Sequence, residues 1–117
     1  MQYLCLVCLD SEIAASLSKA QWKDVERDSL DYDDVLRSGG NYVTSSALKA
    51  PETARTIRIR DGRRSLTDGP YVETKEHVAG FILIEAENMD DAMEKAAGIP
   101  LARIGSIEVR ELVDIAR

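Results

Sequence analysis

A nearly unbroken apolar segment at residues 78–86 sets the strongest limit on how this chain can fold. A strand that is apolar at successive positions, rather than at every second one, has to be covered on both faces. Residues 3–9 form another apolar run of strand length near the start of the chain, and they predict a buried first strand. The chain is therefore expected to fold around two buried strands, with helices covering one face of their sheet.

Segments with helical and strand periodicity alternate around these two strands. Ser18 can cap a helix that runs to about Ser38, where two glycines end it. Further strands are expected at residues 42–48, 56–60, 64–67 and 106–112, and a second helix from Asn88 or Asp90 to about Gly98. Without the short middle hairpin, the order is β-α-β-β-α-β, the ferredoxin-like arrangement. The prediction is one α+β domain over residues 1–117, with an antiparallel sheet.

The expected sheet has helices on one face only, and its other face still carries apolar residues. Large exposed apolar surfaces are usually covered by a partner. A second copy of the chain is the simplest cover, so we predict a homodimer in which two sheets pack against each other.

The middle hairpin combines strict alternation with a cluster of arginines. The alternation in residues 56–60 predicts that Ile57 and Ile59 face inward, and Asp61-Gly62 predicts a type I′ turn. Five arginines lie on or beside this hairpin: Arg55, Arg58, Arg60, Arg63 and Arg64. They form either an anion-binding surface or a solvated strand face.

Composition excludes several classes of function. The chain has 117 residues, a net charge of −6 and a pI near 4.8, which argues against direct nucleic-acid binding. The apolar runs are too short for a membrane span or a signal sequence, so a cytoplasmic location is expected. Cys5 and Cys8 lie within an apolar strand and are interpreted as small core residues rather than a redox or metal pair. Nucleotide-binding motifs and zinc spacing are also missing, so no cofactor or metal is predicted.

Residues 67–76 combine turn-forming residues with charged side chains and one aromatic ring. Gly69 relaxes the backbone, whereas Pro70 fixes it, and both are interpreted as structural. Asp68 either caps the loop through backbone hydrogen bonds or acts as a catalytic base at the mouth of a cleft.

Four neighbours of Asp68 are further site candidates. His77 is the single histidine of the chain, and an imidazole can exchange a proton near neutral pH. It is either a catalytic acid or base or an exposed or structurally bonded residue. Lys75 and Glu73 either pair with loop charges or bind substrate, with Lys75 suited to a carboxylate or phenolate. Tyr71 either stacks on a planar ligand or packs beneath the loop.

These motifs together resemble the YCII-related proteins, specifically their DGPF branch. The resemblance is carried by residues 58–62, by Thr67-Asp68-Gly69-Pro70, and by residues 73–76, 80 and 108–110. It implies a dimeric α+β barrel, in which two ferredoxin-like chains pack sheet to sheet. Tyr71 stands where the branch has Phe. Residues 27–30 lack the histidine of the His–Asp pair that some members of the wider family are thought to use, so a mechanism through that pair is not carried over.

Two functional hypotheses follow from the resemblance. The chain is either a cofactor-free enzyme or binder of a small organic molecule, or a non-catalytic accessory protein. In the first case Asp68 or His77 transfers a proton in an elimination or isomerisation. In the second, the loop contacts a partner or senses a ligand, and an extracytoplasmic-function sigma factor is the partner that the resemblance implies.

Overall fold

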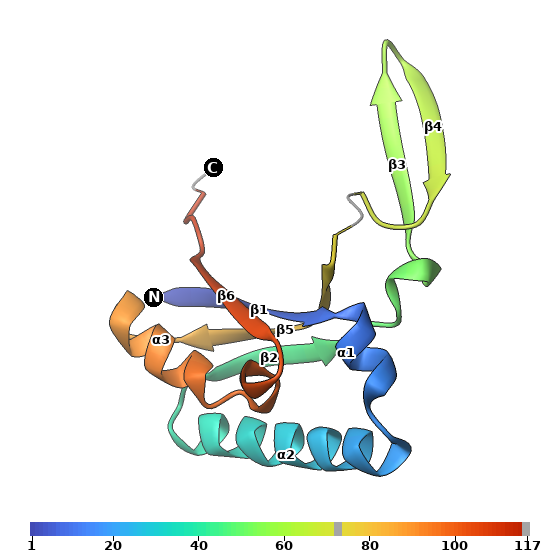
Figure 1. Cartoon of the computed structure of the whole chain (residues 1–117). Coiled ribbons are helices and arrows are strands. Elements are labelled where there is room, and N and C mark those ends of the chain that lie inside the picture. Colours follow the sequence, from blue (N-terminus) through green and yellow to red (C-terminus); the bar gives the residue numbers. More distant parts are fainter. Residues whose placement is uncertain (72–73, 116–117) are drawn as a thin grey trace.

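The computed structural model describes residues 1–71 and 74–115 (Figure 1). Its elements follow the predicted order, with a short additional helix, α1, and two 3-10 turns, η1 and η2. They are β1 (Gln2–Asp10), α1 (Ser11–Ser16), α2 (Lys19–Ser38), β2 (Tyr42–Ala47), η1 (Pro51–Thr53), β3 (Arg55–Arg60), β4 (Arg63–Asp68), β5 (Glu76–Glu85), α3 (Met89–Ala97), η2 (Pro100–Arg103) and β6 (Ser106–Glu111).

Four strands form the main sheet in the order β2-β5-β1-β6. Each neighbouring pair is antiparallel, and the two apolar strands β1 and β5 lie at the centre. With β3 and β4 set aside, this is the strand order of a ferredoxin-like sheet. The predicted α+β, ferredoxin-like fold is therefore confirmed.

The core lies between this sheet and the helices α2 and α3, which cover one face of it (Figure 1). On β1, every second residue is buried, from Tyr3 through Cys5 and Val7 to Leu9. The intervening residues of the central strands lie on the other face and are only half-buried: Leu4, Leu6, Phe81 and Leu83. The sheet therefore has one face packed against helices and one apolar face that none of the described helices covers.

Helix α2 begins at the predicted cap. The side chain of Ser18 accepts a hydrogen bond from the backbone N–H of Gln21, and the Gln21 side chain accepts one from the backbone N–H of Ser18. This reciprocal pair satisfies two N–H groups that the first turn would otherwise leave unpaired.

One charged residue of this helix is buried. A charged side chain on a helix is usually expected on the solvent-exposed face, yet Asp33 is only 8% exposed. Its Oδ2 accepts a hydrogen bond from Ser45 Oγ of β2 at 3.1 Å. The polar side chain of the neighbouring strand makes burial of this carboxylate possible, since a buried charge needs a hydrogen-bond partner.

The β3–β4 hairpin is a separate two-stranded ribbon that projects from the main sheet (Figure 1). Its turn has positive φ at Asp61 (53°) and Gly62 (75°), as a type I′ turn requires. The prediction that Ile57 and Ile59 face inward is wrong, because they are 53% and 61% exposed. Alternation identifies which residues share a face of a ribbon, but it cannot tell whether anything covers that face.

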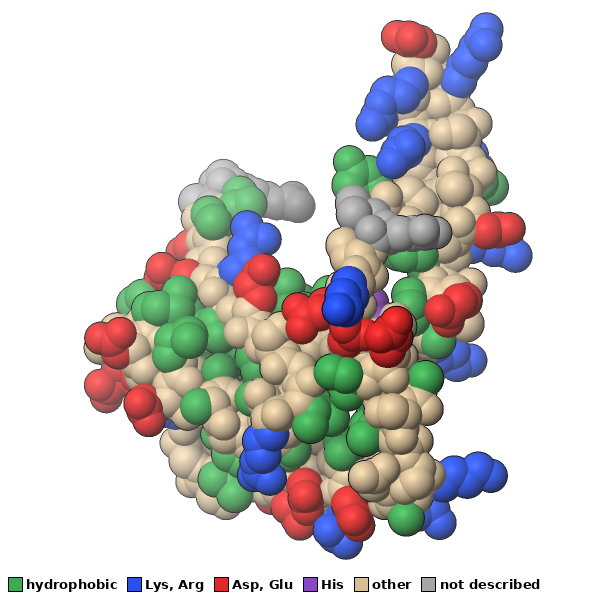
Figure 2. Space-filling view, in the orientation of Figure 1, with side chains coloured by type: hydrophobic (Ala, Val, Ile, Leu, Met, Phe, Trp, Pro, Cys, Tyr) green, Lys and Arg blue, Asp and Glu red, His purple; other side chains and the backbone are tan. Residues whose placement is uncertain are grey.

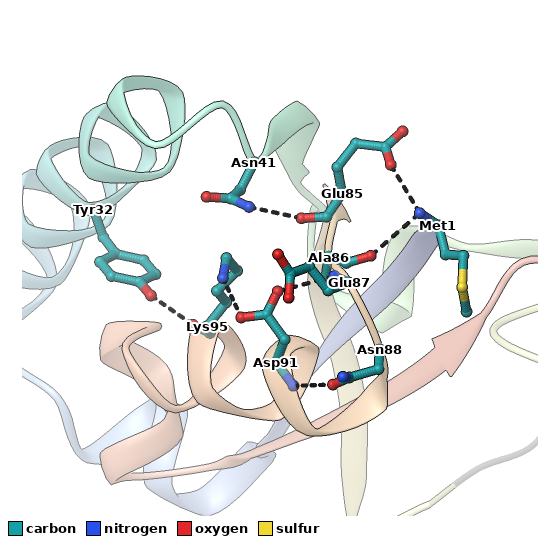
Figure 3. Close-up of polar contacts among 9 residues, drawn as sticks. All are labelled: Met1, Tyr32, Asn41, Glu85, Ala86, Glu87, Asn88, Asp91 and Lys95. Carbon is teal, nitrogen blue, oxygen red and sulfur yellow. Dashed lines mark hydrogen bonds and ion pairs between the residues drawn. The ribbon is translucent and has the colours of Figure 1, made fainter.

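Hydrogen bonds and ion pairs fix the corner where β5 passes into α3 (Figure 3). Asp91 Oδ2 accepts a hydrogen bond from the backbone N–H of Glu87 at 2.9 Å, and Oδ1 accepts one from Lys95 Nζ at 2.5 Å. The backbone N–H of Asp91 donates to Asn88 Oδ1 at 2.8 Å, which caps the helix. Asp91 is therefore the centre of this turn.

The turn is expected to make folding stability depend on pH. The hydrogen bond from Lys95, followed by that from the Glu87 backbone, lowers the pKa of Asp91 from its ordinary value. A carboxylate whose pKa is lower in the folded state stabilises the fold above its unfolded pKa of about 4, and this contribution disappears as pH falls through the folded pKa. Asp91→Asn should lower stability at pH 7 and flatten the loss on acidification.

Urea unfolding at neutral and acidic pH checks this expectation. Asp90→Asn is the matched control, because it removes the same charge from the same helical turn without touching Glu87 or Lys95. A pH dependence that is identical in Asp91→Asn and the unmodified chain would contradict the assignment.

Candidate functional site

The candidate site lies where β1 ends and β5 begins. Asp10, the last residue of β1, caps α1 by accepting a hydrogen bond from the backbone N–H of Glu12 at 2.8 Å. The residue is 9% exposed. The backbone N–H of Ser11 then donates to the carbonyl of Lys75 at 3.3 Å. These bonds join the start of α1 to the start of β5.

His77 lies inside this junction. In the β1–β5 register it is opposite Leu9, whose side chain is buried under the helices. His77 is half-buried, and its Nδ1 lies 3.2 Å from Ser11 Oγ, within hydrogen-bonding distance. The pair has two forms. If Ser11 donates, Nε2 carries the ring proton; if Nδ1–H donates to Ser11, Nε2 has a free lone pair.

Two further polar pairs surround the histidine. Lys75 Nζ lies 3.7 Å from Asp10 Oδ2, with the lysine side chain 80% exposed. Ser106 Oγ donates to Glu76 Oε2 at 3.3 Å. Because Lys75 is so exposed, its ion pair adds little stability, and its ammonium group remains accessible to a ligand.

Two adjoining cavities meet at His77. One has a volume of about 750 Å³ and lies between α2 and the sheet, with Trp22, Val25 and Ile82 among the residues that line it. The other, of about 830 Å³, lies under the segment that precedes β3 and is lined by Gly69, Pro70 and Tyr71, among others. His77 contributes to both cavities, as do Leu48, Lys49 and Ala50.

The charges in the cavity walls are mixed. Lys49 belongs to both walls. Glu26 and Asp33 line the first cavity, and Glu52 and Glu76 line the second. Asp33 and Glu76 already accept hydrogen bonds from serines.

The structure separates the predicted site residues into two groups. His77 and Lys75 lie at the junction just described. Asp68 ends β4 on the projecting hairpin, where its side chain is 94% exposed and lies 3.7 Å from Arg55 Nε. Tyr71 is 70% exposed, lines the second cavity, and has the Arg58 guanidinium 5.0 Å from its ring centre. Glu73 lies outside the described residues.

The two cysteines occupy different environments. Cys5 is fully buried, and burial raises the pKa of its thiol to about 11. Burial also raises the pKa of Cys8, with smaller contributions from Glu108 and Glu76. The thiolate is the reactive form, so both thiols are poor nucleophiles at neutral pH. Within residues 1–71 and 74–115, no cluster of three metal-binding side chains occurs and no helix is long and apolar enough to cross a membrane.

This arrangement suits proton transfer to or from a small molecule. A histidine on a cavity wall can act as general acid or base, and a hydroxyl on its second nitrogen selects the tautomer. A serine–histidine pair is also the first half of a nucleophilic site, but such a site needs a third group that orients the base. In the described part of the chain, the His77 ring forms its hydrogen bond with Ser11, and no third group is bonded to the ring.

Sequence reasoning missed Asp10, Ser11 and Lys49. Asp10-Ser11 directly follows the first strand, and an aspartate in that place could have been recognised as a helix cap. No local pattern connects Ser11 with His77, because 66 positions separate them and only the β1–β5 pairing brings them together.

Comparisons with known proteins match nearly the whole length of this chain. The family model for the YCII-related domain matches residues 1–116. The chain is also similar to an uncharacterized protein, R00369, of Rhizobium meliloti (strain 1021). The two are 32% identical over 114 residues, which cover 96% of this chain and 92% of that protein. This chain belongs to the family of proteins with a YCII-related domain.

Proposed function

We propose that this protein is a cofactor-free enzyme that moves a proton on a small organic molecule, with lyase-like or isomerase-like chemistry. The observation that carries the proposal is the position of His77, on the wall shared by two cavities and with Ser11 at its Nδ1. In the reactive tautomer, Nδ1–H donates a hydrogen bond to Ser11 Oγ. His77 Nε2 then removes a proton from carbon and returns it to a second carbon or to a leaving group.

Lys49 supports this chemistry because it is a positively charged residue that lines both cavities. When a proton leaves a carbon next to a carbonyl group, negative charge develops on the carbonyl oxygen, and a nearby cation stabilises it. The proposed substrate is therefore a carbonyl compound with an acidic C–H group. Lys75, Tyr71 and Glu73 are proposed to contact it from the loop side, and Asp68 is the competing candidate for the proton-transfer group.

The proposal includes a homodimer formed through the uncovered sheet face, as in a dimeric α+β barrel. Leu4, Leu6, Phe81 and Leu83 supply its apolar centre. The DGPF-branch assignment rests on Thr67-Asp68-Gly69-Pro70 and likewise remains a proposal.

Imidazole NMR tests the binding step directly, because His77 is the single histidine in the sequence. A panel of 2-oxo acids and 1,3-dicarbonyl compounds is added to ¹⁵N-labelled protein. Compounds that enter the site should shift the ring signals of His77 and the backbone amides of Lys49 and Ala50. A panel in which no compound shifts these signals would count against the proposed substrate class.

A measurement of turnover distinguishes the proposed enzyme from the alternative, a non-catalytic accessory protein. Each compound that shifts His77 is incubated with the protein in D₂O, and deuterium incorporation at carbon is measured. Exchange above the rate without protein supports the enzyme. Binding without exchange would instead favour the accessory alternative, in which the protein senses a ligand and contacts a partner such as a sigma factor.

A further inference from the structure

The β3–β4 ribbon has two chemically different faces. The register places Ile57 opposite Leu66 and Ile59 opposite Arg64. These residues share one face, and its three aliphatic side chains are between 53% and 66% exposed. The residues that alternate with them along each strand point to the other face. That face carries three arginines near the turn: Arg58, Arg60 and Arg63. The face with the three aliphatic side chains is the apolar face of the ribbon, although Arg55 and Arg64 also lie on it, and the other face is cationic.

The apolar face needs a cover. A two-stranded ribbon is only marginally stable in water unless its apolar side packs against something. Here the ribbon is held mainly at its base, where the backbone N–H of Gly69 donates to the Ala54 carbonyl at 2.7 Å and Thr56 Oγ1 donates to the Gly69 carbonyl at 2.9 Å. Ile59 lies next to the turn, away from these bonds, and is 61% exposed.

The distribution of charge along the chain indicates which partner covers the apolar face of the ribbon. Residues 55–68 contain five arginines and two aspartates, a net charge of +3, so the rest of the chain carries −9 to give the total of −6. In Figure 2, basic side chains dominate the outer end of the ribbon, whereas the body below it carries acidic side chains interspersed with basic ones. The ribbon of one copy is therefore attracted electrostatically to the body of another.

The position of the ribbon also favours a second copy of the chain as the partner. In Figure 1 it projects beyond the main sheet on the side opposite to α2 and α3. That is the side of the half-buried apolar face of β1 and β5, which includes Leu6 and Phe81. A second copy that packs on this face would lie within reach of the ribbon, and its own ribbon would reach back because a twofold interface is reciprocal.

We propose that the β3–β4 ribbon is an arm that clasps a second copy of this chain. Ile57, Ile59 and Leu66 pack against the partner's apolar surface, and the arginines contact its acidic groups. The arm leads directly into Gly69, Pro70 and Tyr71, which line the second cavity. Clasping would thus hold that cavity wall in place. This inference rests on the homodimer of the proposed function and adds the element that secures it.

Sedimentation equilibrium of the full chain tests the arm. Ile59→Ser combined with Leu66→Ser removes two apolar contacts and should raise the dimer Kd by about tenfold or more. Val35→Ser is the matched control, because Val35 is 61% exposed on α2, on the other side of the sheet. It should leave the Kd unchanged. Circular dichroism verifies that all variants keep their secondary structure.

A third variant, Leu6→Ser, separates failure of the arm from failure of the dimer. If Leu6→Ser weakens the dimer and the arm variant does not, the arm proposal is overturned while the sheet-to-sheet dimer stands. If the unmodified chain is a monomer across the micromolar range, both proposals fail. A DNA duplex that binds the unmodified chain and is released by Arg60→Ala with Arg63→Ala would assign the arm to nucleic acid and overturn the clasp.

Discussion

His77→Gln is expected to lower the rate of deuterium exchange into a bound carbonyl compound by about 100-fold to 10,000-fold, the usual contribution of a general acid or base. Gln keeps a polar group near Ser11 but cannot take up a proton at neutral pH. Because His77 contributes to the walls of both cavities, the effect should be the same for compounds of different size. Exchange is measured at saturating ligand concentration, so that weaker binding does not imitate slower chemistry.

Asp68→Asn is the comparison that assigns the proton-transfer group. The Asp68 side chain is 94% exposed on the hairpin, with its ion pair to Arg55, so its loss should leave exchange unchanged. The opposite pattern, with exchange lost in Asp68→Asn and kept in His77→Gln, would move the chemistry to Asp68. Ser11→Ala tests positioning: it should lower the rate less than His77→Gln and change the tautomer seen by imidazole NMR.

Gly105→Ala is expected to give the largest loss of stability. Gly105 lies between η2 and β6, and its backbone N–H donates to the Leu101 carbonyl at 2.7 Å. A methyl group added there would overlap the carbonyl oxygen of Cys8 in β1. The carbonyl oxygen belongs to the backbone and the added methyl group is held directly on Cα, so no side-chain rotation relieves the overlap. The expected cost is about 3 kcal/mol, the upper range for overpacking, and it should lower Tm by roughly 10 °C or more.

Thermal unfolding followed by circular dichroism measures this effect against Gly39→Ala. A methyl group at Gly39 would meet Asn41 Oδ1 at 2.6 Å, but that oxygen ends a side chain that can move, and the nearest backbone atom, the Val35 carbonyl oxygen, is 3.7 Å away. Gly39→Ala should therefore cost much less. Equal Tm values for the two variants would show that η2 shifts away from β1 without penalty.

Local sequence patterns predicted most elements of this fold correctly. The apolar runs gave β1 and β5, Ser18 gave the start of α2, and Asp61-Gly62 gave the hairpin turn. Each of these depends on residues within a few positions of one another, so the information is present in a short stretch of sequence. The order of those elements was then sufficient to predict a ferredoxin-like sheet.

The site was predictable only in part. Lys75 and His77 were identified because they are titratable residues beside a structured loop. Their partners Asp10 and Ser11 were not, because a hydrogen bond across 66 positions depends on strand pairing rather than on spacing. Asp68 shows the reverse: its place in a conspicuous loop suggested a site residue, whereas the hairpin carries its side chain into solvent.

The sequence by itself determined the strands, the two longer helices and their order, since backbone propensity, capping and hydrophobic periodicity act over short distances. Tertiary structure alone decided which apolar residues are covered and which polar groups meet. Ile57 and Ile59 alternate as core residues do, yet they are exposed because their ribbon leaves the sheet. Asp33 is charged, yet it is buried because β2 brings Ser45 to it. Burial and long-range pairing are properties of the packed chain, and no single segment encodes them.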